Sequence, residues 1–295
     1  MQPADFLSAV FFYLKVGENL NQNWIVENLN NAFSTWNGKL GELWGLVTTG
    51  PQTFKGGAVW SVMQTLHNGM VGIGYALVVL FFAISLCKNT MNFHELKRPE
   101  AAINYLIRFV AAKALVGYGM DIMLNVFSIC NGIVTDMADS MGGISEAMVS
   151  LPAEMQTAIE NVGFLASIPL WLVTILGSLF ITVLSFVMIL TVYGRFFRLY
   201  MYTALAPLPL AAFAGESTQS VGISFLKSYV GVCLEGAVIV LACVIYSAFV
   251  STPTVASGEA TTIVWSYLAE TVFNMLVLVG LIKGSDRIIH EMMGL

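Results

Sequence analysis

Charged side chains are scarce in this sequence. Asp, Glu, Lys and Arg together make up 11% of its 295 residues, whereas an ordinary soluble protein carries roughly 25%. Hydrophobic residues make up 57%. This number of charges is too small to solvate the surface of a water-soluble protein of this size. The composition therefore indicates that lipid is the main solvent.

The sequence also has few of the residues that enzymes and metal proteins use. It contains neither a GxxxxGK[ST] phosphate loop nor a G-x-S-x-G nucleophile turn. Its histidines form no HExxH pattern and its cysteines no CxxC pattern. These residues are His67, His94, His290, Cys87, Cys130, Cys233 and Cys243. We therefore expect a protein that is not an enzyme and holds no cofactor, no metal and no disulfide framework.

Long apolar runs, by contrast, are abundant. A bilayer span needs about 20 apolar residues, and five runs reach that length, at residues 68–87, 101–131, 164–193, 221–250 and 262–282. The expected fold class is therefore all-α, a polytopic membrane helix bundle of five transmembrane helices. Residues 68–295 would form this bundle, and residues 1–67 would precede it as a separate region.

The region of residues 1–67 has a different pattern. Apolar side chains recur there at the three-four spacing of an amphipathic helix. They are Ile25, Leu29, Phe33, Trp36, Leu40, Leu43 and Val47. We interpret the region as extracytoplasmic or interfacial, with its helix either lying on the outer leaflet or packing against a partner subunit.

The distribution of basic residues predicts the orientation in the membrane. Connections that contain Lys or Arg alternate with connections that lack both. Residues 135–160 and 251–262 lack both, and the only charged residue in the second of these segments is Glu259. The basic connections hold Lys88, Lys97, Arg98, Arg195, Arg198, Lys283 and Arg287. Because Lys and Arg concentrate in cytoplasmic connections, we expect the N-terminus outside and the C-terminus in the cytoplasm, in the cytoplasmic membrane.

Two prolines interrupt the apolar sequence between the third and fourth runs. A helix cannot continue comfortably through Pro207 and Pro209, because proline lacks the backbone donor and clashes with the preceding turn. Irregular backbone at membrane depth is tolerated only where it is buried in protein or lines a wet cavity. The stretch APLPLAAF, residues 206–213, therefore predicts a half-inserted or re-entrant elbow at the cytoplasmic face. The alternative is a kinked connector without specific contacts.

Charged and polar residues inside the runs are the strongest physical signal. On a continuous helix, Lys113, Gly117, Asp121, Asn125 and Ser128 would fall within about 120° of arc. A charge at the bilayer centre costs at least ~2.5 kcal/mol on insertion scales, so this stripe should face protein or water.

Two acids in other runs carry the sign opposite to that of Lys113. They are Glu235 in the fourth run and Glu270 in the fifth. Two interpretations of the intramembrane charges remain open: buried ion pairs that fix the register of the helices, or a polar translocation path or protomer contact. The sequence does not separate them, because both require the charges to avoid lipid.

The region around the two prolines resembles the TrbL-like polytopic subunits of conjugative type IV secretion systems. In that family, an arginine-bearing helix end leads through an APLPLA-type segment and an acidic, Ser-rich turn into an S-x-x-K-x-Y helix start. The corresponding residues here are Arg195, Arg198, Pro207, Pro209, Glu216, Ser217, Ser224, Lys227 and Tyr229. Residues 46–86 are also similar to versions of the family from Gram-positive mobile elements.

This resemblance implies a structural channel or scaffold subunit that assists DNA and protein translocation across the cytoplasmic membrane. The partners it implies are other membrane subunits and ATPases of the secretion system, further copies of the chain, membrane lipids and, transiently, the single-stranded DNA–protein substrate. It supplies no catalytic residue. The alternative is a stand-alone small-solute transporter or ion channel, although transporters often contain corresponding broken helices in two halves, and this chain has one broken region.

Overall fold

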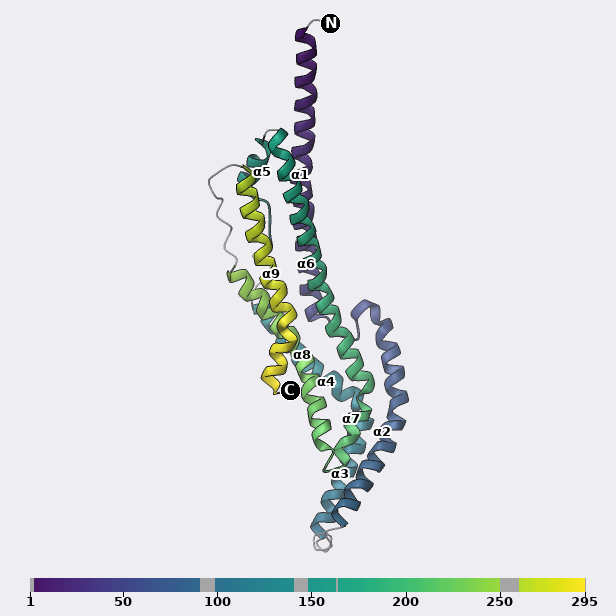
Figure 1. Cartoon of the computed structure of the whole chain (residues 1–295). Coiled ribbons are helices and arrows are strands. Elements are labelled where there is room, and N and C mark those ends of the chain that lie inside the picture. Colours follow the sequence, from purple (N-terminus) through teal and green to yellow (C-terminus); the bar gives the residue numbers. More distant parts are fainter. Residues whose placement is uncertain (1–2, 91–98, 141–147, 163, 250–259, 295) are drawn as a thin grey trace. The chain divides into compact units, whose positions relative to one another are not determined.

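The computed structural model describes residues 3–90, 99–140, 148–162, 164–249 and 260–294, and these residues form helices joined by turns (Figure 1). Four helices in these ranges are long and apolar enough to cross a bilayer, and a bent pair of helices can supply a fifth span. The prediction of an all-α polytopic bundle is confirmed. The helices are α1 (Pro3–Thr48), η1 (Phe54–Gly57), α2 (Ala58–Thr90), α3 (Pro99–Gly117), α4 (Gly119–Ser140), α5 (Ala153–Glu160), α6 (Phe164–Leu205), α7 (Pro207–Ala211), η3 (Ala212–Ala214), α8 (Gln219–Phe249) and α9 (Ala260–Met293).

Several helices extend beyond the apolar runs that predicted them. Helix α2 begins at Ala58 and already contains His67, and α9 continues to Met293. Helix α6 continues to Leu205, so Arg195 and Arg198 lie inside a helix and not at its end. A helix can continue beyond its last apolar residue when its polar side chains have hydrogen-bond or ion-pair partners. Hydropathy detects only the apolar part of such a helix.

The chain divides into two compact units, which we describe separately. The first comprises Met1–Gly45, Gly142–Thr191 and Leu241–Lys283, and the second comprises Leu46–Met141, Val192–Val240 and Gly284–Leu295. The long helices α1, α6, α8 and α9 each contribute residues to both units.

In the first unit, α1 packs against helices of its own chain. The ring of Phe33 lies 6.5 Å from the ring of Tyr267 on α9, and the Asn28 amide donates a hydrogen bond to Ser178 on α6, at 3.1 Å. The predicted apolar stripe of α1 is fully or almost fully buried. We had expected this stripe on the outer leaflet or on a partner subunit. Helical periodicity identifies the face that is buried but does not identify what covers it.

In the second unit, the second predicted span is broken. Helices α3 and α4 meet at Tyr118 with a bend of 73°. A Cβ at Gly119 would lie 3.2 Å from Cδ1 of Leu210 and 3.4 Å from Cε1 of His67, so the close packing at the break uses a glycine. The continuous stripe predicted from Lys113 to Ser128 is therefore wrong, because Lys113 lies on α3 and the other polar residues lie on α4.

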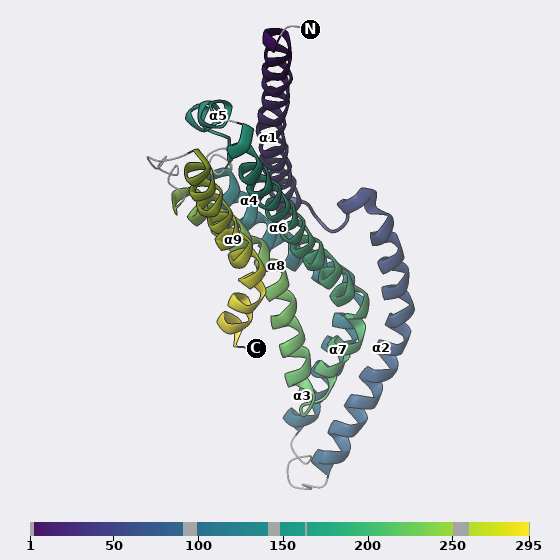
Figure 2. The ribbon, with the colours of Figure 1, turned by 45° about the horizontal axis from the view of Figure 1, so that its top comes forward.

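The elbow of the second unit has specific contacts. Helix α6 ends at Leu205, and Pro207 takes the first position of α7, where its missing N–H needs no helical partner. Helix α7 packs on α2 and α3, and η3 packs on the same two helices; Figures 1 and 2 both show α7 beside α2. A Cβ at Gly74 of α2 would lie 2.9 Å from the carbonyl oxygen of Pro207. Of the two sequence-based alternatives, the connector without contacts does not fit this packing.

Candidate functional site: a buried charged cluster and a polar groove

The most deeply buried charge in the second unit is the guanidinium group of Arg195, whose side chain has no exposed surface. Its Nε donates to the carbonyl oxygen of Val232 at 3.2 Å, and its Nη2 donates to that of Cys233 at 3.0 Å, both on α8. Its Nη1 donates to the carbonyl oxygen of Val47 at 3.4 Å, in the last turn of α1. Carbonyls in the last turn of a helix lack helical partners and carry partial negative charge. Arg195 therefore joins the end of α1 to α8.

A glycine makes room for this guanidinium. A Cβ at Gly236 of α8 would lie 2.8 Å from both Nη1 and Nη2 of Arg195. The arginine and the glycine therefore form one packing unit, and the close approach of α6 to α8 depends on both residues.

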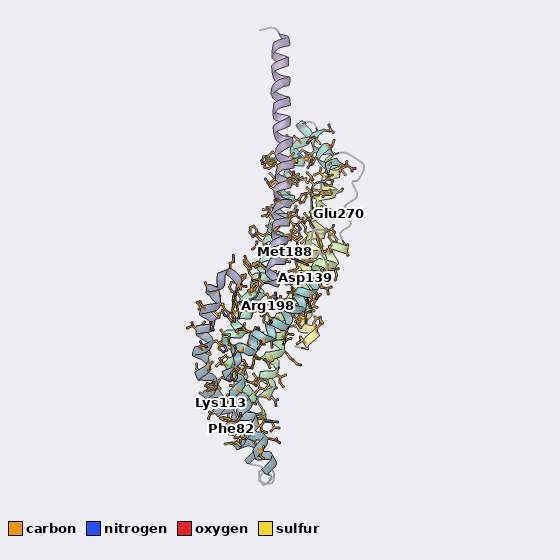
Figure 3. All side chains as sticks on the ribbon, turned by 180° about the vertical axis from the view of Figure 1, so that it is seen from behind. Phe82, Lys113, Asp139, Met188, Arg198 and Glu270 are labelled. Carbon is orange, nitrogen blue, oxygen red and sulfur yellow. The ribbon has the colours of Figure 1, made fainter. Side chains whose placement is uncertain are left out.

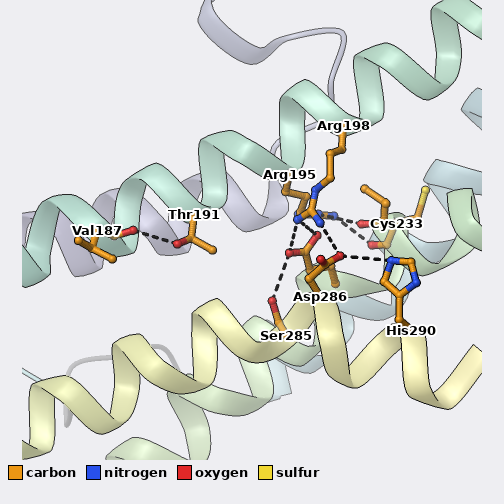
Figure 4. A network of polar contacts seen from close by, with 10 residues as sticks. Val187, Thr191, Arg195, Arg198, Cys233, Ser285, Asp286 and His290 are labelled. Carbon is orange, nitrogen blue, oxygen red and sulfur yellow. Dashed lines mark hydrogen bonds and ion pairs between the residues drawn. The ribbon is translucent and has the colours of Figure 1, made fainter. Parts of the chain in front are cut away.

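One turn further along α6, Arg198 binds two carboxylates. Its Nη2 donates to both oxygens of Glu235 on α8, at 2.6 and 2.7 Å, and its Nη1 donates to Oδ1 of Asp286 on α9. Ser285 donates to Glu235 at 3.2 Å. Nε2 of His290 lies 3.6 Å from Asp286. Figure 4 shows these side chains converging from the three helices.

The formal charges of this cluster balance. Arg195 and Arg198 supply two positive charges, and Glu235 and Asp286 supply two negative ones. The Glu235 side chain is 1% exposed and that of Arg198 is 28% exposed, so the pair is largely removed from solvent. A buried pair of this kind adds little net stability over an apolar pair of the same shape, but the loss of either partner is costly. Its direct effect is to fix which residues of α6, α8 and α9 face one another.

The sequence predicted some of these residues but not their pairing. The sequence showed only that Glu235 is opposite in sign to Lys113, whereas its partner in the structure is Arg198. Arg195 and Arg198 were expected at a cytoplasmic rim, and the continuation of α6 places them in the cluster. Asp286 lies beyond the fifth predicted run, residues 262–282, and was not among the predicted site residues. Asp286 lies four residues before His290, and this i, i+4 spacing is the sequence signal that could have indicated a helix continuing past the apolar run.

The remaining predicted site residues lie outside the cluster. Glu270 is exposed on α9 of the first unit, and Lys113 and Lys227 are exposed on α3 and α8 of the second unit. Glu216, also exposed, follows η3 and lies 3.7 Å from the guanidinium of Arg108. Figure 3 labels Lys113 and Glu270.

A polar groove forms a second feature of the second unit. Asp121, Asn125 and Ser128 of α4 line an open groove of about 520 Å³. Gly50, Pro51, Gln52, Leu124, Phe127 and Asn131 complete its lining. The Asn131 amide donates to the carbonyl oxygen of Thr48 at 3.2 Å, and Tyr200 donates to that of Pro51 at 2.9 Å. The bond to Pro51 holds the wall formed by residues 50–52, and the bond to Thr48 holds the chain just before it, so the groove is a supported surface.

In the cluster, Glu235 accepts hydrogen bonds from Arg198 and Ser285, and Asp286 accepts one from Arg198. Among the residues that the structure describes, no group of three His, Cys, Asp or Glu side chains could hold a metal ion. The geometry is that of a structural joint beside an accessible polar surface.

Comparison with known proteins gives one family. The family model of the TrbL/VirB6 plasmid conjugal transfer like proteins matches residues 36–207. The match covers more than half of the chain, from the C-terminal part of α1 through α6 to the first proline of the elbow. No curated protein and no solved structure matches the chain. The match confirms the resemblance seen in the sequence: the chain belongs to the TrbL/VirB6-like family, and it is a multi-pass membrane protein of a conjugal transfer system of type IV secretion.

Proposed function

We propose that the protein is a structural channel or scaffold subunit that assists DNA and protein translocation across the cytoplasmic membrane. The observation that carries this proposal is the family match over residues 36–207. The subunit works as a homo-oligomer beside other membrane subunits, and separate ATPases supply the energy. The translocating single-stranded DNA–protein substrate touches it only in passing.

The second unit has physical features that suit a scaffold. Arg195, Arg198 and Glu235 bind the protein itself, so they are not available to a solute. Their bonds hold α1, α6, α8 and α9 in fixed register, which suits a part that must keep its shape while a large substrate passes. The polar groove on α4, with its one carboxylate at Asp121, remains accessible.

Gene deletion and complementation test this role. Deleting the gene from a conjugative element is expected to abolish DNA transfer in a mating assay, and the wild-type gene supplied in trans should restore it. Purification of tagged protein from mating cells should bring down other subunits of the secretion system. A stand-alone transporter or ion channel would instead leave transfer intact, and that result would refute the proposal.

The proposed orientation places Met148 outside and Gly294 in the cytoplasm. This orientation depends on Lys88, on the basic residues of α9, and on Lys97 and Arg98, of which the last two lie outside the described residues. Arg195 no longer supports it, because this residue is fully buried inside α6. In a cysteine-free variant, Met148→Cys should react with a membrane-impermeant maleimide in intact cells, and Gly294→Cys only after lysis.

Two further labelling sites bear on the same orientation. His94, outside the described residues, is expected in the cytoplasm, so His94→Cys should behave like Gly294→Cys. The four native cysteines need replacing first, because Cys87 is exposed and would react. Labelling of position 94 or 294 in intact cells would contradict the orientation.

A further inference from the structure

Lys113 of α3 is a positive charge on an otherwise apolar surface. Leu106 and Val110, seven and three residues before it on the same side of the helix, are 59% and 56% exposed. Lys113 itself is exposed and forms no ion pair with any described residue (Figure 3). A charge is costly on a surface that faces lipid, and such charges face protein or water almost without exception. The surface around Lys113 should therefore face water or protein, and a protein that covers it should carry a negative charge there.

Asp121 of α4 is the matching negative charge. It is exposed in the polar groove, where Asn125 and Ser128 lie one and two turns further along the same face, and it also has no ion pair within the described ranges. Gly132 continues this face, with nothing within 4 Å of where its Cβ would lie. Small and polar residues on one face let a second membrane helix approach closely and hydrogen-bond to it. The groove lining includes no basic residue, so its charge suits a cation.

The two charges lie on either side of the break between α3 and α4. Lys113 is four residues before the end of α3 at Gly117, and Asp121 is two residues after the start of α4 at Gly119. At 1.5 Å per residue, they lie about 6 and 3 Å along their helices from the break. When copies are related by a rotation axis along the membrane normal, each residue keeps its depth in every copy. Two copies that meet at this break would therefore bring Lys113 of one copy near Asp121 of the other.

We propose that the partner of this surface is a second copy of the chain: Lys113 of one copy enters the polar groove of the next and pairs with Asp121. Such a contact joins two different surface patches, so it is head-to-tail and closes into a ring when the rotation permits. The groove volume of about 520 Å³ is within the range of roughly 300–1,000 Å³ of binding pockets. It therefore has room for the lysine and for apolar neighbours on α3. The inference rests on the homo-oligomer of the proposed function and identifies its contact from these charges and the groove, and its tests do not involve translocation.

Cross-linking between two differently tagged copies tests the contact. Both copies are cysteine-free except that one carries Lys113→Cys and the other Asp121→Cys, and they are co-expressed and oxidised in membranes. We expect a disulfide-linked dimer that contains both tags. Each variant expressed alone should give none, because a head-to-tail contact does not bring either position to its own copy. A matched control pairs Lys113→Cys with Glu270→Cys, since Glu270 is also an exposed acid in an apolar helix.

Charge reversal tests the same contact without cysteines. Lys113→Glu and Asp121→Lys should each lower the oligomeric fraction in native electrophoresis of mild-detergent extracts by about tenfold or more, since like charges then face each other. The double reversal should restore it. Both side chains are exposed, so the variants should insert normally, and membrane immunoblots check this.

Three outcomes would overturn the proposal. The first is cross-linking of Lys113→Cys to Glu270→Cys instead of to Asp121→Cys. The second is an unchanged oligomeric fraction in both single reversals. The third is a disulfide-linked dimer from either single-cysteine variant expressed alone, which would make the contact symmetric and not head-to-tail. DNA transfer enters none of these measurements, so failure of this contact and failure of the proposed function are distinguishable.

Discussion

Replacing Glu235 by leucine is expected to destabilise the protein by about 3–5 kcal/mol, the usual effect of removing one partner of a buried ion pair. Glu235 is 1% exposed and accepts two bonds from Arg198 and one from Ser285. Without it, two arginines face the single carboxylate of Asp286. Thermal unfolding in detergent, followed by size-exclusion chromatography, measures the effect.

The double replacement Arg198→Met with Glu235→Leu is expected to recover much of this loss. It leaves one cation, Arg195, which keeps its three carbonyl acceptors, and one carboxylate, Asp286, which is 44% exposed and can be solvated. Apolar residues of similar volume can replace a buried pair at little or no cost. The recovery therefore separates a charge imbalance from a general packing defect.

A second glutamate supplies the control. Glu270 is also in an apolar helix, but it is exposed and has no ion pair within the described part of the chain. Glu270→Leu should change stability by no more than about 0.5 kcal/mol. Equal losses from Glu235→Leu and Glu270→Leu, or no recovery in the double variant, would show that the cluster does not act through its charges.

Replacing both prolines of the elbow by alanine is expected to lower DNA transfer severely while membrane insertion and abundance stay near normal. Inside a helix, each proline costs about 3 kcal/mol relative to alanine. Without them, α6 can continue through Ala206 and carry the following residues away from α2 and α3, on which α7 now packs. Immunoblots of membranes beside a mating assay measure the two effects.

A control and a second variant sharpen this result. Pro169→Ala removes an exposed proline from inside α6 and should leave transfer unchanged. Gly74→Val adds atoms where a Cβ would already lie 2.9 Å from both Val116 and the Pro207 carbonyl oxygen, and it should impair transfer while both prolines remain. Gly72→Val, on the same helix with nothing within 4 Å, should not.

The elbow hypothesis has two ways to fail. Normal transfer from the double proline variant would mean that the elbow is only a connector. Disappearance of the protein from the membrane would mean that the prolines serve folding and not assembly.

The sequence by itself determined the fold class, the family and the faces of the helices. Hydropathy located the membrane helices, because apolar runs of about 20 residues are typical of segments that cross a bilayer. Three-four spacing identified the buried stripe of α1, from Ile25 to Val47, because side chains at that spacing share one face. The two prolines located the end of α6, because two closely spaced prolines remove backbone donors and clash with the preceding turn, although α6 accommodates the single Pro169. All these features depend on local geometry, which the order of residues encodes directly.

Only the tertiary structure decided which faces and charges meet. It paired Glu235 with Arg198, although Lys113 has the same charge, because the continuation of α6 brings Arg198 against α8. It separated Lys113 from Asp121 by a 73° bend at Tyr118, where the sequence shows only an apolar run containing two glycines. It also placed α9 against the stripe of α1 at Phe33, and α6 beside α1 at Asn28. Attraction between opposite charges and burial of apolar area are both indifferent to sequence distance, so the partner of each group follows from the packing of the whole chain.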